Sequence, residues 1–319
     1  MHLHLRHIQE IEDMVGRLRS LQDGDKAIVD VVACGSRAVP FLRALLFARE
    51  PSGLTQVRRR VIQALAALGA EDVLLAYLKE PCEASDPVER AGDEDAKNIA
   101  AGCIRRPGEG VAFGVLLDLA RRKPLPAAIA ALGRSRRAEA IPMLVAALAE
   151  DACRLSAERA LVDMDADAVP HLTAAALRRE PSDEDESESS LRRRRSALQV
   201  LRDMGVPADA WPALREALYE RDDAVALAAA RIALECAPKP DRKDAVRRLL
   251  DIIDRAGAAW RMEIEDALTE HFETAEPSIK ERLEDIGDDP RPDSCRHLTR
   301  ASLLRVMWRA DFVPRAVGR

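Results

Sequence analysis

The stretch Val57-Arg-Arg-Arg-Val-Ile-Gln-Ala-Leu-Ala-Ala-Leu-Gly69 decides the fold of this chain. Its large apolar residues follow one another at the spacing i, i+4, i+5, i+8 and i+11: Val57, Val61, Ile62, Leu65 and Leu68. This spacing places them on one face of an α-helix. Glycine at the end of such a pattern is typical of a helix C-terminus. The stretch therefore predicts an amphipathic helix that ends at Gly69.

Parts of this stretch recur along the chain. Ala64–Gly69 returns as Ala128–Gly133, an offset of 64 residues, or two periods of 32. Arg159, Arg195 and Arg231 are separated by 36 and 36 residues, and each precedes a similar Ala/Leu pattern. A fixed period of 20 to 50 residues is the signature of an array in which each unit packs on its neighbours.

A second marker has the form Ala-x-Pro-x-Leu. It appears at 38–42, 140–144, 168–172 and 210–214. Proline is tolerated in the first turn of a helix, where its missing N–H would have no partner anyway. The marker therefore predicts the start of the first helix of a hairpin, and the Arg/Ala/Leu stretch predicts the second helix.

These markers predict an all-α solenoid of about seven to eight helical hairpins. The hairpins are expected near 37–69, 71–105, 109–134, 137–164, 166–204, 207–236 and 240–270. We expect an N-terminal helical cap over 1–34, the repeat array over 35–270 and a C-terminal helical cap over 271–319. Alternating β-branched runs, which would indicate strands, hardly occur.

The composition agrees with closely packed helices. Of 319 residues, 47% are hydrophobic but only 3% are aromatic, so the core must consist largely of Ala, Leu, Val and Ile. The net charge of −6 disfavours nucleic acid as a partner. No apolar run approaches the roughly 18 residues of a membrane helix, and the first ten residues lack a signal-peptide pattern. We expect a cytoplasmic protein that does not enter a membrane, with mostly buried, unpaired cysteine thiols.

The two markers resemble the HEAT-repeat family, and more narrowly the short bacterial HEAT-like repeats first associated with phycobilin lyases. The resemblance covers roughly 35–270 and is best at Val57–Gly69. It implies a right-handed superhelix whose second helices line a concave surface. It also implies a non-catalytic role as a scaffold, adaptor or regulator that binds another protein.

The arginines of the second helices are the candidate binding residues. They are Arg58, Arg59, Arg60, Arg134, Arg136, Arg137, Arg192, Arg193, Arg194 and Arg195. They could form a basic surface for an acidic segment of a partner protein, bound with marked salt dependence. The alternative is that they pair with acidic residues of adjoining repeats, as one arginine per unit often does in HEAT repeats.

An acidic insertion interrupts the array at 181–190. It contains no apolar residue that could offset its ordering entropy, so we expect an exposed, protease-sensitive loop. The residues that mark it are Pro181, Asp183, Glu184, Asp185, Glu186 and Glu188.

Catalytic and metal-binding motifs are not apparent. His2, His4 and His7 cluster at the N-terminus, but no acidic or cysteine ligand completes a recognised spacing. The His-Glu pairs of the HEAT-repeat iron enzyme deoxyhypusine hydroxylase are missing, as are the G-x-S-x-G elbow and the phosphate loop. We therefore predict no catalytic residues, metal or cofactor. The alternatives are a HEAT-like nucleic-acid-binding protein, a DNA glycosylase-type enzyme, or an accessory subunit of an enzyme complex.

Overall fold

The computed structural model describes residues 2–48, 55–81, 85–181, 186–287 and 295–312. Within these ranges the chain is helical, and the one β feature is a single bridge between Pro181 and Glu186. The chain divides into two compact units, unit 1 over Met1–Met164 and unit 2 over Asp165–Arg319. Each unit is described by itself.

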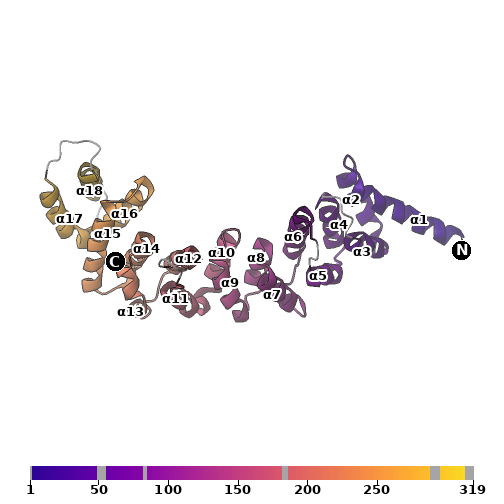
Figure 1. The fold of residues 1–319 in the computed structure, drawn as a ribbon, viewed down its shortest axis with the longest axis horizontal. Coiled ribbons are helices and arrows are strands. Elements are labelled where there is room, and N and C mark those ends of the chain that lie inside the picture. The colour runs from indigo at the N-terminus through magenta and orange to yellow at the C-terminus, as the bar shows by residue number, and fades with distance from the viewer. Residues whose placement is uncertain (1, 49–54, 82–84, 182–185, 288–294, 313–319) are drawn as a thin grey trace. The chain divides into compact units, whose positions relative to one another are not determined.

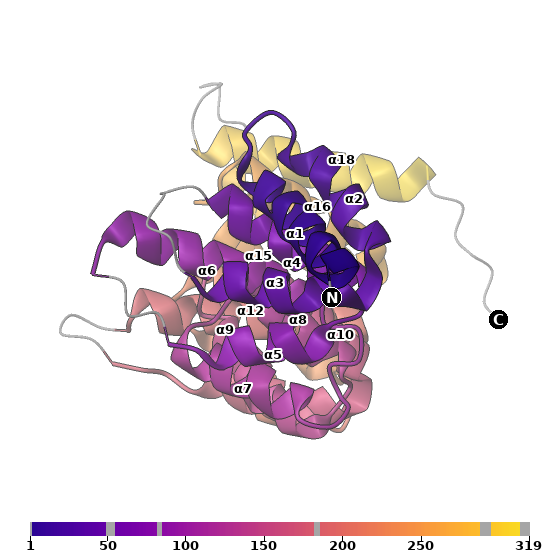
Figure 2. The ribbon, with the colours of Figure 1, turned by 90° about the vertical axis from the view of Figure 1, so that its right-hand side faces the viewer.

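Unit 1 consists of paired helices in two layers. Its elements are α1 (His2–Gly16), η1 (Arg17–Arg19), α2 (Gly24–Ala33), η2 (Gly35–Ala38), α3 (Val39–Phe47), α4 (Thr55–Ala67), α5 (Glu71–Lys79), α6 (Pro87–Gly102), α7 (Ala112–Arg122), α8 (Pro126–Arg134), η3 (Ala138–Ala140), α9 (Ile141–Ala147) and α10 (Arg154–Met164). The even-numbered helices α2, α4, α6, α8 and α10 pack side by side in one layer, and α3, α5, α7 and α9 form the other (Figure 1). At the N-terminal end α1 lies against α2 and α3 (Figure 2).

Unit 2 repeats this plan. Its elements are η4 (Asp165–Ala168), α11 (Val169–Leu177), α12 (Glu188–Met204), α13 (Trp211–Leu214), η5 (Arg215–Tyr219), α14 (Asp223–Cys236), α15 (Lys239–Ile253), α16 (Ala258–Glu270), α17 (Phe272–Ile286) and α18 (Cys295–Phe312). Helices α12, α14, α16 and α18 contact one another in turn, and α11, α13, η5, α15 and α17 form the second layer.

The predicted hairpins coincide with consecutive helix pairs, from α3–α4 to α15–α16. The markers act as expected. Pro40 and Pro142 lie in the first turns of α3 and α9, and Gly69 follows α4 with a φ of +71°. The all-α solenoid predicted from the sequence is therefore confirmed. Helices α17 and α18 continue the pairing through the segment predicted as a C-terminal cap.

Small residues set the helix spacing within a layer. A Cβ atom on Gly133 of α8 would lie 2.4 Å from the Cβ of Ala160 on α10, so the two helices touch at the backbone. Alanines on both helices are fully buried, among them Ala128 and Ala157. The low aromatic content thus reflects a core filled by closely approaching helices rather than by large side chains.

Arginines from neighbouring helices bond to the carbonyl groups at helix C-termini. Arg122 of α7 donates to the Leu78 carbonyl of α5 at 3.0 Å, and Arg194 of α12 donates to the Ala176 carbonyl of α11 at 2.7 Å. Arg248 of α15 donates to the Glu220 carbonyl after η5 at 2.7 Å. The last carbonyls of a helix have no partner inside it and carry partial negative charge, so a guanidinium group is well suited to bind them. These arginine–carbonyl contacts give part of the basic content a structural role.

None of the helices in the described part of the chain is long and apolar enough to cross a membrane.

Candidate functional site

The three arginines that begin α4 have three different environments. Arg60 is buried and donates to Asp25 at 2.7 Å and to the carbonyls of Leu18 and Ser20 at 3.0 and 2.7 Å. Arg58 is half-buried and pairs with Glu89 of α6 at 3.2 Å. Arg59 is exposed and has no hydrogen bond or ion pair among the described residues. Only Arg59 of this triplet is thus fully available to a partner.

The arginines after the start of α12 are all engaged. Arg194 has a fully buried side chain that donates to Glu186 at 2.7 Å and to Glu220 at 2.6 Å. Arg193 is buried and donates to Glu180 at 2.7 Å and to the Arg178 carbonyl at 2.8 Å.

Arg192 and Arg195 of the same helix are half-buried. Arg192 lies 4.0 Å from Glu188. Arg195 pairs with Asp222, the N-cap of α14. Burial alone would raise the pKa of Asp222, but hydrogen bonds from Arg195 and from the Val225 N–H outweigh it and hold that pKa below its usual value. The guanidinium groups of these four arginines are therefore mainly engaged with other groups of unit 2, and they expose little basic surface to a partner.

The arginines at the end of α8 remain largely exposed. Arg134 donates to the Ile104 carbonyl at 3.4 Å, and Arg136, with a φ of 51°, has no bond among the described residues. Arg137 stacks over the ring of Phe113 at 4.0 Å and pairs with Glu139 at 2.6 Å. The hydrogen bond from Arg137 lowers the pKa of Glu139. Arg134 and Arg136 thus have no carboxylate partner in the described part of the chain.

The three arginines spaced by 36 residues also differ. Arg195 pairs with Asp222 and Arg231 pairs with Glu263 at 3.2 Å. Arg159 on α10 is exposed, and no ion pair or hydrogen bond joins it to the described residues. The sequence identified Arg159 as a repeat marker but not as a candidate binding residue.

Two apolar residues beside Arg159 are also exposed. Leu155 and Val162 lie on the same side of α10 and are 61% and 38% exposed. The sequence contains a signal for these two residues, because the α10 segment carries apolar residues on two faces. A helix that packs on one side needs apolar residues on only one face.

The acidic insertion is shorter than predicted on its C-terminal side. Ser187 caps α12 through a hydrogen bond from the Ser190 N–H, so residues 188–190 form the first turn of a helix rather than a loop. Pro181 and Glu186 form a β-bridge, and the Glu186 carboxylate is held by Arg194 and Arg179. Asp183, Glu184 and Asp185 lie outside the described residues. Protease sensitivity stays a prediction.

The predicted histidine cluster also falls outside the described side chains, since those of His2, His4 and His7 are not among them. In the described part no group of three His, Cys, Asp or Glu side chains is arranged to hold a metal ion. Cys153 is buried, Cys34, Cys103 and Cys236 are half-buried, and Cys295 is exposed. Burial raises the thiol pKa of Cys103, Cys153 and Cys236.

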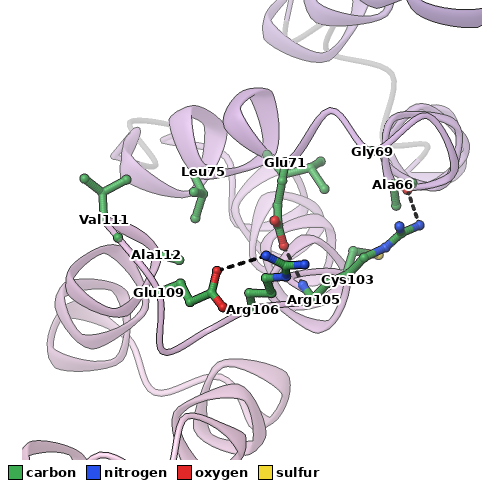
Figure 3. Close-up of a pocket in the computed structure, with 12 residues that line it drawn as sticks. Ala66, Gly69, Glu71, Leu75, Cys103, Arg105, Arg106, Glu109, Val111 and Ala112 are labelled. Atoms are coloured by element: carbon green, nitrogen blue, oxygen red, sulfur yellow. Dashed lines mark hydrogen bonds and ion pairs between the residues drawn. The ribbon is translucent and has the colours of Figure 1, made fainter.

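A pocket of about 530 Å³ lies in unit 1 between the α4–α5 turn and the α6–α7 connection. Figure 3 shows Glu71 and Leu75 of α5 on one side and Arg106 and Glu109 on the other. Arg106 donates to Glu109 at 3.3 Å, Glu71 accepts from the Arg105 N–H, and the Arg105 guanidinium donates to the Ala66 carbonyl. Because these polar groups bond to one another or to the backbone, they are less available to a ligand than the exposed arginines.

Comparison with known proteins finds no matching family model and no matching curated protein. Among solved structures, the chain is similar to the karyopherin Kap121p bound to the extreme C-terminus of the protein phosphatase Cdc14p, at a TM-score of 0.34 and 13% identity. The match covers 97% of this chain and 42% of the karyopherin chain. This chain therefore spans less than half the length of that protein.

Proposed function

We propose that this chain is a HEAT-type repeat protein of the short bacterial kind that acts in the cytoplasm as a non-catalytic scaffold, adaptor or regulator. Its partner is an acidic segment of another protein. The segment binds to the even-numbered helix layer of unit 1, through exposed arginines that we call the arginine face: Arg59, Arg134, Arg136 and Arg159.

One observation carries the proposal. The four residues of the arginine face are exposed and form no hydrogen bond or ion pair with a carboxylate among the described residues, whereas Arg60, Arg193, Arg194 and Arg195 are bonded to acids inside their units. In a protein of net charge −6, these exposed arginines on α4, at and just after the end of α8, and on α10 supply a local basic field. Such a field steers and orients an acidic partner more than it adds affinity. Buried arginines cannot contribute in this way, so Arg60, Arg193 and Arg194 are left out of the proposed surface.

The test is charge reversal with a matched control. Arg59→Glu combined with Arg159→Glu should weaken capture of the partner from the native host's lysate, and binding of the parent should fall steeply as salt rises. Arg121→Glu is the control, because Arg121 is an exposed arginine of the same unit on the other helix layer. It should leave capture unchanged.

Melting followed by circular dichroism accompanies the capture experiment. The double variant should melt close to the parent temperature, since neither side chain has a hydrogen bond or ion pair to lose among the residues that the structure describes. Equal capture by the double variant and the parent would reject the arginine face. Retention of the parent on heparin at moderate salt, with no protein captured, would favour the nucleic-acid alternative instead.

A further inference from the structure

Helix α18 of unit 2 carries basic and apolar residues on the side turned away from α16. Arg305 and Arg309 pair with two acids of α16 at 2.6 and 2.9 Å, so they mark the side of α18 that faces α16. At about 100° per residue, the other side of α18 consists of Arg296, Arg300, Leu304 and Met307. Leu304 is 43% exposed there.

The adjoining side of α17 is acidic. Arg282 of α17 pairs with Asp254, directly after α15, and so marks the side of α17 that faces α15. At about 100° per residue, the opposite side consists of four exposed residues, Glu273, Pro277, Lys280 and Glu284. Lys280 pairs with Glu276 of its own helix at 2.8 Å. Because both sides are turned away from the preceding pair α15–α16, they form one surface of α17 and α18.

The two halves of this surface carry opposite charges. Helix α17 contains five acids and two bases, and α18 contains four arginines and one acid. Glu273, Glu284 and Arg296 have no hydrogen bond or ion pair among the described residues. A surface with an acidic helix beside a basic helix is complementary to a rotated second copy of itself. A partner that carries charge of only one sign would be repelled by one of the two helices.

The carboxylate of Asp254 shows how α17 and α18 are aligned. It accepts hydrogen bonds from Arg282 of α17 and from the Thr299 hydroxyl of α18, the latter at 3.1 Å. Arg282 is near the end of α17 and Thr299 is near the start of α18, so the two helices run antiparallel with these residues at one level. A residue that follows Thr299 therefore lies level with one that precedes Arg282 by the same number of positions.

We propose that two copies of this chain associate through this surface, so that α17 and α18 of both copies form a four-helix bundle. A two-fold axis parallel to the helices sets α18 of each copy against α17 of the other and keeps every residue at its level. It places Arg296 against Glu284 of the second copy, and Leu304 against Pro277 of the second copy. Each contact occurs twice in the dimer. The surface belongs to unit 2, so this inference goes beyond the proposed function and does not depend on the arginine face of unit 1.

Charge reversal tests the pairing of α17 with α18. Sedimentation velocity of the intact chain, with a reductant because Cys295 is exposed, should show a dimer that dissociates on dilution and at high salt. Arg296→Glu sets acid against acid and Glu284→Arg sets base against base, so each variant alone should weaken the dimer at least about tenfold. An equal mixture of the two variants should recover the dimer. In the mixed pair the introduced acid faces the introduced base, and the second contact is the parental one.

The apolar part of the surface has a closely matched control. Leu304→Ser should weaken the dimer about tenfold, because the Leu304 side chain is buried in it twice. Leu298→Ser is the control: Leu298 lies on the same helix and is 42% exposed, but it is about 120° away from Leu304 around α18. It should leave the dimer unchanged. Both variants should keep the circular dichroism spectrum of the parent.

Three results would overturn the proposal. The first is a parent that stays monomeric up to its solubility limit, and the second is a mixture of the charge variants that does not recover the dimer. The third is equal behaviour of Leu304→Ser and Leu298→Ser. A dimer that Arg296→Glu breaks but Glu284→Arg leaves intact would show α18 on α18, and would overturn the pairing of α18 with α17.

Discussion

The arginine runs of α4 and α12 look alike in sequence but serve their units differently. In α4 one of three arginines is buried, and its carboxylate partner, Asp25, is 82% exposed. In α12 two of four are buried, and Arg194 binds two shielded acids, with Glu186 5% and Glu220 18% exposed. Successive helix positions point in directions about 100° apart, so a run of arginines is divided between core and solvent. A basic run on a helix is therefore not a basic surface until its partners are known.

The largest expected effect comes from breaking the α12 cluster. Arg194→Met would leave Glu186 and Glu220 close together with fewer donors, and removing one side of a buried ion pair costs about 3–5 kcal/mol. All three tryptophans, Trp211, Trp260 and Trp308, belong to unit 2, so fluorescence during urea unfolding reports on that unit. Arg247→Gln is the control and should cost less than about 1 kcal/mol, because the Arg247 side chain is 71% exposed and its pair with Asp244 lies at the surface of the same unit. Equal costs for the two variants would show that burial does not separate these arginines.

Arg60→Met in α4 should cost less, about 1–3 kcal/mol, from the loss of two hydrogen bonds to the Leu18 and Ser20 carbonyls. Asp25 stays hydrated when its partner is removed. Hydrogen exchange of peptides from α2 and α4 should rise, while tryptophan fluorescence should keep the parent midpoint. Gly24→Ala should act on the same contact, because its Cβ would lie 2.1 Å from a guanidinium nitrogen of Arg60. Parent-like exchange in both variants would contradict the structural role of Arg60.

Lowering the pH tests a third pair, which joins Arg195 to Asp222 and is only partly buried. The pKa of Asp222 is below the usual value in the folded unit, despite burial, because of the Arg195 and Val225 hydrogen bonds. The contribution of Asp222 to the free energy of unfolding is therefore present above about pH 4, and it is lost as the pH falls through the lower pKa of the folded state. Asp222→Asn should cost about 1 kcal/mol at pH 7 and flatten the fall in unit 2 stability below pH 4. An unchanged acid profile, measured by tryptophan fluorescence, would count against this coupling.

The smallest effect is expected at Arg59. Arg59→Gln removes no bond among the described residues, so the free energy of unfolding should change by less than about 0.5 kcal/mol. Thermal melting by circular dichroism is sufficient to measure it. A cost as large as that of Arg60→Met would place Arg59 in the interior network and remove it from the arginine face.

The sequence predicted the helix pairs because their signals are local. Pro40 starts a helix and Gly69 ends one through the backbone of those residues alone. The environment of each arginine depends instead on distant residues: Arg60 bonds to Asp25, 35 positions away, and Arg194 bonds to Glu220, 26 positions away. Arg159 illustrates the reverse case: its position in the repeat gave no sign that it would have no acidic partner among the described residues, whereas Arg195 and Arg231 each have one. Periodicity predicts which side of a helix is buried, but not which charged groups meet there.

The arginine–carbonyl contacts determine how this protein can be divided into fragments. Because the donor to a helix end often comes from a later helix, a fragment that stops at a hairpin boundary loses groups that its last helices need. A fragment ending after α6 would lack Arg122 and leave the Leu78 carbonyl without its donor, and one ending after α14 would lack Arg248 and free the Glu220 carbonyl. Fragments should therefore extend one helix past the last hairpin of interest, so that each retained helix end keeps the side chain that covers it.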